Sequence, residues 1–218
     1  MTAGAAGAPT GPAALTARPV LGGTLVRIEA LEQRHLPDLL RIAFAHPDEF
    51  RLTSTPTDAA AADKYFGAVF AQRDAGHAYP VAILDAAGKV VGTSRLSEID
   101  FRHLRCELGF SWYDPATFRT GVNIESKLLL LRFAFEALGM HRVQIHTDTR
   151  NVRSQKAILA LGARFEGVLR RHQVAKDGYV RDTMVYGITD LDWPEVEQRL
   201  LGRLARRLEG QRAAIQSG

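Results

Sequence analysis

Apolar and polar residues alternate along the middle of the chain in a pattern that is typical of β-strands. Three such segments follow one another closely, at residues 79–85, 89–100 and 104–113, and a short Ala-Ala-Gly segment separates the first two. Alternation indicates a strand with one buried face, and a short connection that contains glycine predicts a hairpin. The pattern therefore predicts an antiparallel meander of three strands.

On both sides of the meander, apolar residues follow the spacing of helices as well as that of strands. Polar caps and terminal glycines support the helix boundaries, as at Asp58 before one helix and Gly139 and Gly162 after two others. The expected segments are a strand at 24–31, helices at 32–45 and 58–76, a helix at 124–138, a strand at 141–149, a helix at 151–161, and two strands around a turn at 176–178. This order predicts an α/β (α+β) domain in which helices flank one mostly antiparallel sheet of about seven strands.

The two ends of the chain differ in composition from the middle. Residues 1–22 are rich in Ala, Gly and Pro and lack the basic and apolar regions of a secretory signal, so we expect a disordered tail. One domain is then expected at 23–190, an amphipathic helix at 191–210 and a second disordered tail at 211–218. The apolar stripe of that helix can pack on the domain itself or on a second copy of the chain, which would give a homodimer.

Composition excludes several classes of protein. The chain has 218 residues, of which 46% are apolar, and this is enough for one substantial core. It has no uninterrupted apolar segment of the roughly 18 residues that a membrane span needs. Cys106 is the only cysteine, so neither an internal disulfide nor a cysteine-based zinc site can form. We expect a cytoplasmic protein without a membrane partner or a metal, in which Cys106 is a buried apolar residue rather than a nucleophile.

Positive charge is concentrated in one stretch, although the net charge is only +4. Residues 141–171 contain seven Arg or Lys residues and two acidic ones. Such a stretch suits a phosphorylated ligand or a nucleic acid, and a solvated basic face is the alternative interpretation. Because the chain has no aromatic motif for reading RNA, we do not expect nucleic acid as a partner.

The segment FRTGVNIESK, residues 118–127, lies between a predicted strand and a predicted helix and has features of an anion-binding loop. The first turn of a helix presents unpaired N–H groups and the positive end of the helix dipole. Gly121 would let the backbone approach a ligand closely, and Arg119 adds a positive charge. The segment matches neither of the common glycine-rich phosphate motifs, so an ordinary turn before a helix is the alternative.

A second helix start has similar features. Asn151 is a good N-cap, Ser154 falls three residues later, and Arg153 and Lys156 lie in the first turns. Two helix starts that both follow strands would suit a ligand with several phosphates. Two ordinary helix caps are the alternative.

The order of elements resembles that of the GNAT acyl-CoA N-acetyltransferases, over most of residues 24–188. The likeness is densest from Glu107 to Leu169, and the run NVRSQKAILALGARFEG resembles the RimJ/RimL-like branch of ribosomal-protein N-terminal acetyltransferases. The resemblance implies acetyl-CoA as co-substrate and direct attack by a primary amine, either a protein N-terminus or a small amine such as an amino acid, a polyamine or an aminoglycoside. A non-catalytic module that binds coenzyme A or RNA is the alternative from a different class.

The resemblance also implies roles for individual residues. Backbone amides of residues 119–124 would bind the pyrophosphate of the coenzyme, and its pantetheine arm would lie between the strands at 104–113 and 141–148. The backbone N–H of Phe110 or of a neighbouring residue would polarise the thioester carbonyl, as a strand bulge does in the family. Arg153 and Lys156 would meet the nucleotide's phosphates. The residues expected to bind the coenzyme are Phe110, Trp112, Arg119, Thr120, Gly121, Val122, Asn123, Ile124, Asn151, Arg153, Ser154 and Lys156.

The chain departs from the family's pattern at four positions. Phe118 and Asn123 replace the usual outer residues of the phosphate loop, and Asn123 can instead cap the following helix. Ile158 stands where many members have a tyrosine that protonates the leaving thiolate. Gln173 stands where the RimL-like branch has a glutamate base, so the acid and the base must be found elsewhere.

Acetyl transfer needs a neutral amine and a proton for the departing thiolate. Strict alternation puts Glu107 on one strand face with Arg105, Gly109 and Ser111, opposite Cys106, Leu108, Phe110 and Trp112. We expect Glu107 to act as the base and Ser154 as the acid or as a hydrogen-bond donor to the sulfur. The alternatives for the base are Glu98, His103, His172 and water, and Glu107 could instead form an ion pair with an arginine.

Overall fold

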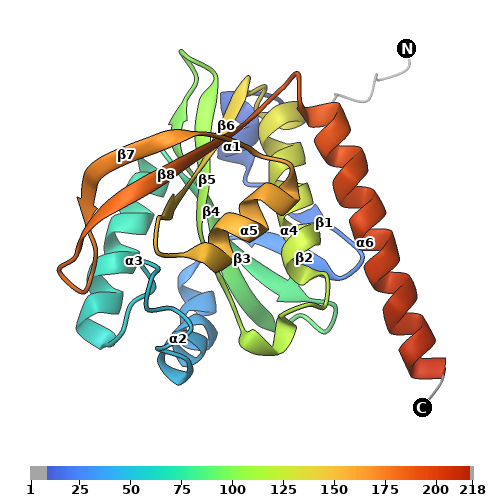
Figure 1. Cartoon of the computed structure of the whole chain (residues 1–218), viewed down its shortest axis with the longest axis horizontal. Helices are drawn as coiled ribbons and strands as arrows, with labels where there is room; N and C mark the ends of the chain where they lie inside the picture. Colours follow the sequence, from blue (N-terminus) through green and yellow to red (C-terminus); the bar gives the residue numbers. More distant parts are fainter. Residues whose placement is uncertain (1–8, 217–218) are drawn as a thin grey trace, which may run out of the picture.

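One β-sheet runs through the computed structural model, which describes residues 9–216 (Figure 1). In this range the sheet has eight strands in the order β1-β2-β3-β4-β5-β6-β8-β7. Neighbouring described strands are antiparallel apart from β5 and β6, which are parallel. The strands are β1 (Leu21–Gly22), β2 (Val26–Ala30), β3 (Tyr79–Asp85), β4 (Val90–Asp100), β5 (Arg105–Tyr113), β6 (Arg142–Asp148), β7 (Arg164–Val174) and β8 (Val180–Thr189). The predicted fold class is confirmed, and β1 is an additional strand.

Helices cover both faces of this sheet (Figure 1). They are α1 (Pro12–Ala17), α2 (Leu36–Ala45), α3 (Ala59–Asp74), α4 (Val122–Arg132), α5 (Val152–Leu161) and α6 (Trp193–Gln216), with short helical turns at Gln33–His35, Pro115–Thr117 and Phe133–Ala137. Strand β3 shows how the core is divided, because Val81 and Ile83 pack in the cluster with α4 and α6, whereas Ala82 and Leu84 pack in the cluster with α2 and α3. Among the described residues, no helix combines the length and apolar character that crossing a bilayer requires.

The N-terminal part of the chain is more ordered than its composition predicts. Ala14 and Leu15 of α1 are buried, the N–H of Gly11 donates to the carbonyl of Ala137, and β1 pairs with β2. The expectation of a disordered tail is therefore wrong for residues 9–22, because a few apolar side chains there find a place in the core. Residues 1–8 lie outside the described residues.

The C-terminal helix is longer than expected and packs on the domain. Val196, Leu200 and Leu204 are buried, which confirms that the apolar stripe has a partner within the same chain. α6 continues to Gln216, so the disordered tail predicted from residue 211 is wrong for residues 211–216. Residues 217–218 are outside the described range.

The parallel strands β5 and β6 separate soon after they meet. They pair only over Arg105–Glu107 and Arg142–Gln144. Beyond these residues β6 continues to pair with β8, and β5 continues to pair with β4. The sheet therefore opens between β5 and β6, where the family resemblance implies that the pantetheine arm would lie.

Candidate functional site

A β-bulge at Phe110 changes the direction of side chains in the second half of β5. Phe110 has a φ of 53°, which lies in the left-handed region. Thr93 pairs with Trp112, but Arg95 pairs with Gly109. The chain therefore advances three residues along β5 while it advances two along β4, which is the mark of a β-bulge. The strict alternation expected from the sequence therefore ends at this residue.

The bulge places side chains differently from the sequence prediction. Cys106 and Leu108 pack in the cluster under α4, whereas Trp112 packs in the cluster under α2 and α3, with its ring centroid 5.8 Å from that of Phe50. Ser111 contacts Lys127 of α4, on the face of the sheet opposite Trp112. The expectations that Ser111 shares a face with Glu107 and that Trp112 shares one with Cys106 are wrong. The side chain of Trp112 belongs to the core.

Glu107 lies at the base of the opening between β5 and β6, in contact with a histidine. It is the last residue of β5 that pairs with β6, and only 7% of its surface is exposed. Its Oε2 atom lies 3.1 Å from Nδ1 of His146, which is on β6. Two groups that can exchange a proton thus meet in a largely buried position.

His146 was not among the residues singled out from the sequence. The alternation along β6 puts it on the same side of the strand as Gln144, and Gln144 pairs with Glu107, so the contact could have been found once the pairing of β5 and β6 was assumed. Arg95 and Arg181 also interact electrostatically with Glu107, and burial lowers the pKa of both guanidinium groups. Two positive charges thus lie close to the carboxylate of Glu107.

The structure shows which of the alternative bases lie near Glu107. The ring of His172 is 6.1 Å from that of His146, and its Nδ1 atom is 3.1 Å from Oγ1 of Thr183, so it belongs to the same region. His103 lies exposed in the turn between β4 and β5. Glu98 accepts a hydrogen bond from Gln144 at 3.1 Å and is largely exposed. Of these three, only His172 is brought next to the pair of Glu107 and His146.

The loop before α4 presents backbone N–H groups. α4 begins at Val122, two residues earlier than predicted, and Gly121 is its N-cap residue with a φ of 104°. Arg119 also has a positive φ, of 64°. Within the described part of the chain, the amides of Gly121, Asn123 and Ile124 donate to no protein atom. A helix start with free amides fits the phosphates of a coenzyme.

Asn123 and Gly121 have roles other than those expected. Asn123 is the second residue of α4 and is exposed, so the prediction that it caps the helix is wrong. A Cβ atom on Gly121 would lie 2.8 Å from Leu25 and 3.4 Å from Leu204. The absent side chain therefore makes room for packing behind the loop as well as for the left-handed backbone.

The buried side chain of Glu125, in the first turn of α4, fixes the chain behind this loop. Its carboxylate accepts hydrogen bonds from the N–H groups of Thr24, Leu25 and Val26 at 2.7, 2.6 and 2.8 Å. These charge-assisted bonds join the start of β2 to α4. The loop is therefore held from its rear side before any ligand binds.

The start of α5 has the expected cap but an unexpected ion pair. The side chain of Asn151 accepts a hydrogen bond from the N–H of Ser154 at 3.0 Å, which confirms the predicted N-cap. Arg153 is paired with Glu49, in the loop between α2 and α3, and its guanidinium carbon lies 5.3 Å from the centroid of the Phe118 ring. Lys156 is exposed. Arg153 thus joins the loop before α4 to the loop after α2.

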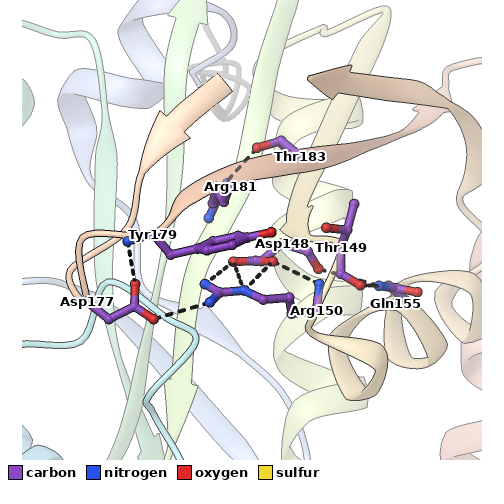
Figure 2. A network of polar contacts seen from close by, with 8 residues as sticks. All are labelled: Asp148, Thr149, Arg150, Gln155, Asp177, Tyr179, Arg181 and Thr183. Atoms are coloured by element: carbon purple, nitrogen blue, oxygen red, sulfur yellow. Dashed lines mark hydrogen bonds and ion pairs between the residues drawn. The ribbon is translucent and has the colours of Figure 1, made fainter. Parts of the chain in front are cut away.

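A network around Arg150 joins the start of α5 to the β7–β8 turn (Figure 2). Arg150 donates to the carboxylate of Asp148 at 2.8 Å and to that of Asp177 at 3.2 Å, and it lies 3.8 Å from the ring of Tyr179. Burial opposes ionisation of Asp148, but the hydrogen bonds from Arg150 outweigh it and hold the pKa of Asp148 below its usual value. The β7–β8 turn is therefore fixed beside the opening.

The same turn also contacts the loop after α2. Nζ of Lys176 donates to the carbonyl groups of Phe50 and Thr55, at 2.9 and 3.0 Å. These bonds connect the β7–β8 turn directly to residues 46–58, which lie between α2 and α3. Lys176 therefore links the β7–β8 turn to the segment between α2 and α3.

A buried lysine lies behind the bulge and was missed in the sequence. Lys127 of α4 is 7% exposed, and its Nζ atom lies 3.1 Å from Oγ of Ser94 and also contacts Oγ of Ser111. Burial lowers the pKa of Lys127 to about 7. In the sequence it looks like an ordinary polar residue of a helix, and only the packing of α4 on the sheet makes it distinctive.

Comparisons with known proteins agree with this geometry. The family model described as an acetyltransferase (GNAT) domain matches residues 26–164. An uncharacterized N-acetyltransferase, YoaA, from Bacillus subtilis is 31% identical over 100 residues, which are 46% of this chain and 55% of that protein. The match thus spans about half the length of this curated relative.

Solved structures share the fold over most of the chain. A crystal structure of an acetyltransferase from T. thermophilus is 36% identical and covers 85% of this chain and 96% of that one, with a TM-score of 0.73. RimJ from Mycobacterium smegmatis, solved in complex with CoA-disulfide, covers 84% and 91% with a TM-score of 0.72. At 20% identity, the likeness to RimJ concerns the fold alone.

Proposed function

Because the chain belongs to the GNAT acetyltransferase family, whose members use acetyl-CoA as co-substrate, we propose that it transfers the acetyl group of acetyl-CoA to a primary amine. The observation that carries the proposal is the opening between β5 and β6, with Glu107 and His146 at its base. The free amides at the start of α4 support it further. A proton acceptor and an anion site on neighbouring elements are what this transfer requires.

The proposed coenzyme site joins two helix starts. The amides of Gly121, Asn123 and Ile124 would receive the diphosphate, and Arg119 would add positive charge at the rim. Arg153 and Lys156, in the first turns of α5, would contact the nucleotide's phosphates, and Asn151 would lie beside the pantetheine arm. Bound in this way, acetyl-CoA supplies the thioester.

In the proposed mechanism Glu107 accepts the proton of the incoming ammonium group, directly or through water, and His146 holds the carboxylate in place. The N–H of Phe110, in the bulge, would donate to the thioester oxygen. A C–N bond forms and the C–S bond breaks. Ser154 would donate a hydrogen bond or a proton to the departing sulfur. No covalent intermediate on the protein is needed.

The bridge between the β7–β8 turn and the loop after α2 supports an acceptor that enters by its end. Lys176 connects the two segments, and we infer that this link favours the end of a chain over an extended chain that crosses the site. A protein N-terminus, as in the RimJ/RimL-like branch, meets this condition, and a small amine also meets it. Two acidic residues between α2 and α3, Glu49 and Asp58, could attract a cationic amine of either kind. They do not decide between the two acceptors, since Glu49 is paired with Arg153 and Asp58 caps α3.

Release of free thiol from acetyl-CoA tests the proposal. The panel should contain peptides with free N-termini, the same peptides with a blocked N-terminus and an internal lysine, and small amines. Transfer to the free N-termini and not to the blocked peptides is the expected result. If no acceptor in a broad panel is acetylated although the coenzyme binds tightly, the chain is instead a non-catalytic coenzyme-binding module.

A further inference from the structure

The C-terminal helix α6 lies beside the loop that we propose binds the coenzyme's diphosphate, although it falls outside the region matched by the family model. At its start, Nε1 of Trp193 donates to Glu136 at 3.1 Å, and Glu136 lies in the helical turn Phe133–Ala137 that directly follows α4. Near its end, Gln211 reaches the loop before α4. α6 therefore runs antiparallel to α4 and brings its last turns to the diphosphate loop (Figure 1).

The contact at that end is a hydrogen bond to the backbone of the loop. Nε2 of Gln211 donates to the carbonyl oxygen of Thr120 at 2.8 Å. In a regular helix this carbonyl would accept from the N–H of Ile124. Here Thr120 lies between two residues with left-handed backbone, Arg119 and Gly121, and its carbonyl accepts from the Gln211 side chain of α6 instead. Packing by Leu204 and the stem of Arg207 against Gly121 adds to the contact.

This hydrogen bond determines the direction of an amide. The carbonyl of Thr120 and the N–H of Gly121 belong to the same trans peptide group, in which they point in opposite directions. A carbonyl held toward α6 thus turns the N–H of Gly121 away from α6. Without Gln211 this peptide group can rotate, because the rotation changes only ψ of Thr120 and φ of Gly121, and glycine accepts a wide range of φ values.

We propose that Gln211 is a positioning residue for coenzyme binding, which acts through the Thr120 carbonyl to aim the Gly121 amide at the diphosphate of acetyl-CoA. The inference rests on the proposed function, because it concerns the same coenzyme site. It also assigns α6 a role: the helix forms the rear support of the diphosphate loop.

Calorimetric titration of the full-length protein with coenzyme A and with pantetheine tests this inference, since pantetheine shares the thiol arm and lacks the diphosphate. Loss of one neutral hydrogen bond predicts that Gln211→Ala raises the Kd for coenzyme A about threefold to tenfold. The Kd for pantetheine should change less than about twofold, within the variation expected of a surface substitution. Gln198→Ala, at an exposed position of the same helix, is the matched control and should leave both constants unchanged.

The outcomes separate this inference from the proposed function. If the unaltered protein does not bind coenzyme A, the proposed coenzyme site itself fails. If it binds, and Gln211→Ala either binds as tightly or weakens both ligands equally, the positioning role is wrong. Should Gln211→Ala fail to fold, Gln211→Glu keeps the size of the side chain, replaces the donor by an acceptor, and should show the same selective loss for coenzyme A.

Discussion

Nδ1 of His146 lies 3.1 Å from Oε2 of Glu107, across the last residues that β5 and β6 share before they separate. The two side chains come from strands about 40 positions apart in the sequence, and they meet only because these strands are parallel neighbours. At this distance the ring of His146 can hold the Glu107 carboxylate in the orientation that would receive a proton from an amine. The pair therefore gives the site a carboxylate whose orientation is fixed by a neighbouring strand.

Replacement of His146 by Asn is expected to lower kcat/KM about tenfold to a hundredfold, because Glu107 then loses the side chain that holds its carboxylate in place. It should also change the shape of the pH profile of kcat/KM, which is the measurement that distinguishes this role from simple packing. His103→Asn is the control, since His103 lies in an exposed turn. Superimposable pH profiles for His146→Asn and the unaltered enzyme would exclude a role for His146 in proton transfer.

Ser154→Ala tests the proposed donor to the leaving sulfur. We expect kcat to fall about tenfold to a hundredfold while coenzyme binding is retained. The N-cap should survive, because Asn151 accepts from the backbone N–H of Ser154 rather than from its hydroxyl. Asn151→Ala removes that cap and should lower the free energy of unfolding by about 1 kcal/mol. A Ser154→Ala enzyme with unchanged kcat would show that the proton comes from elsewhere.

Lys127 makes stability depend on pH in a defined window. Its pKa is lowered from 10.5 to about 7 by burial, so between these values the unfolded chain binds more protons than the folded one. The free energy of unfolding should therefore rise with pH across this window, by at most about 1.4 kcal/mol per pH unit from this group.

Urea unfolding of the wild type and of Lys127→Met at several pH values measures this contribution. The difference between the two curves isolates Lys127 from other titrating groups, and the variant should lose the rise above pH 7. Lys64→Met, on an exposed part of α3, serves as the control. Parallel curves for wild type and Lys127→Met would mean that Lys127 remains charged and solvated in the folded protein.

Arg153 cannot bind the carboxylate of Glu49 and a phosphate group equally well at the same time. If it contacts the nucleotide's phosphates, Glu49→Gln frees it and should lower the Kd for coenzyme A about twofold to threefold, an effect of the size of an exposed ion pair. The gain should disappear at high salt, which screens such interactions. Arg153→Gln should weaken binding instead. Identical Kd values for all three proteins would leave Arg153 as a structural link between the two loops.

The sequence predicts much of the fold because local signals and burial agree. Alternation located the three strands of the meander within one residue, and Asn151 and Asp58 cap the helices where their side chains predicted. The separation of β5 and β6 followed from the family resemblance rather than from the pattern, and the pairing confirms it.

The features that no local pattern predicts depend on contacts between distant segments. The bulge at Phe110 was implied only by the family resemblance, because a phenylalanine rarely adopts a positive φ and nothing in the local sequence indicates one. The burial of Lys127 and the contact of Gln211 with Thr120 arise only when α4 and α6 pack. The N-terminal segment is rich in Ala, Gly and Pro and has few large apolar side chains, so nothing in its sequence indicated that Ala14 and Leu15 are buried.

The central claim is that the opening between β5 and β6 transfers an acetyl group with Glu107 as the base. The most direct measurement compares the unaltered enzyme with Glu107→Gln, by mass spectrometry of an acceptor peptide incubated with acetyl-CoA and by titration with coenzyme A. We predict acetylation of the peptide's N-terminus by the unaltered enzyme, a loss of about a hundredfold or more in kcat/KM for Glu107→Gln, and equal coenzyme binding by both. Full kcat/KM across the pH range in Glu107→Gln would contradict this mechanism.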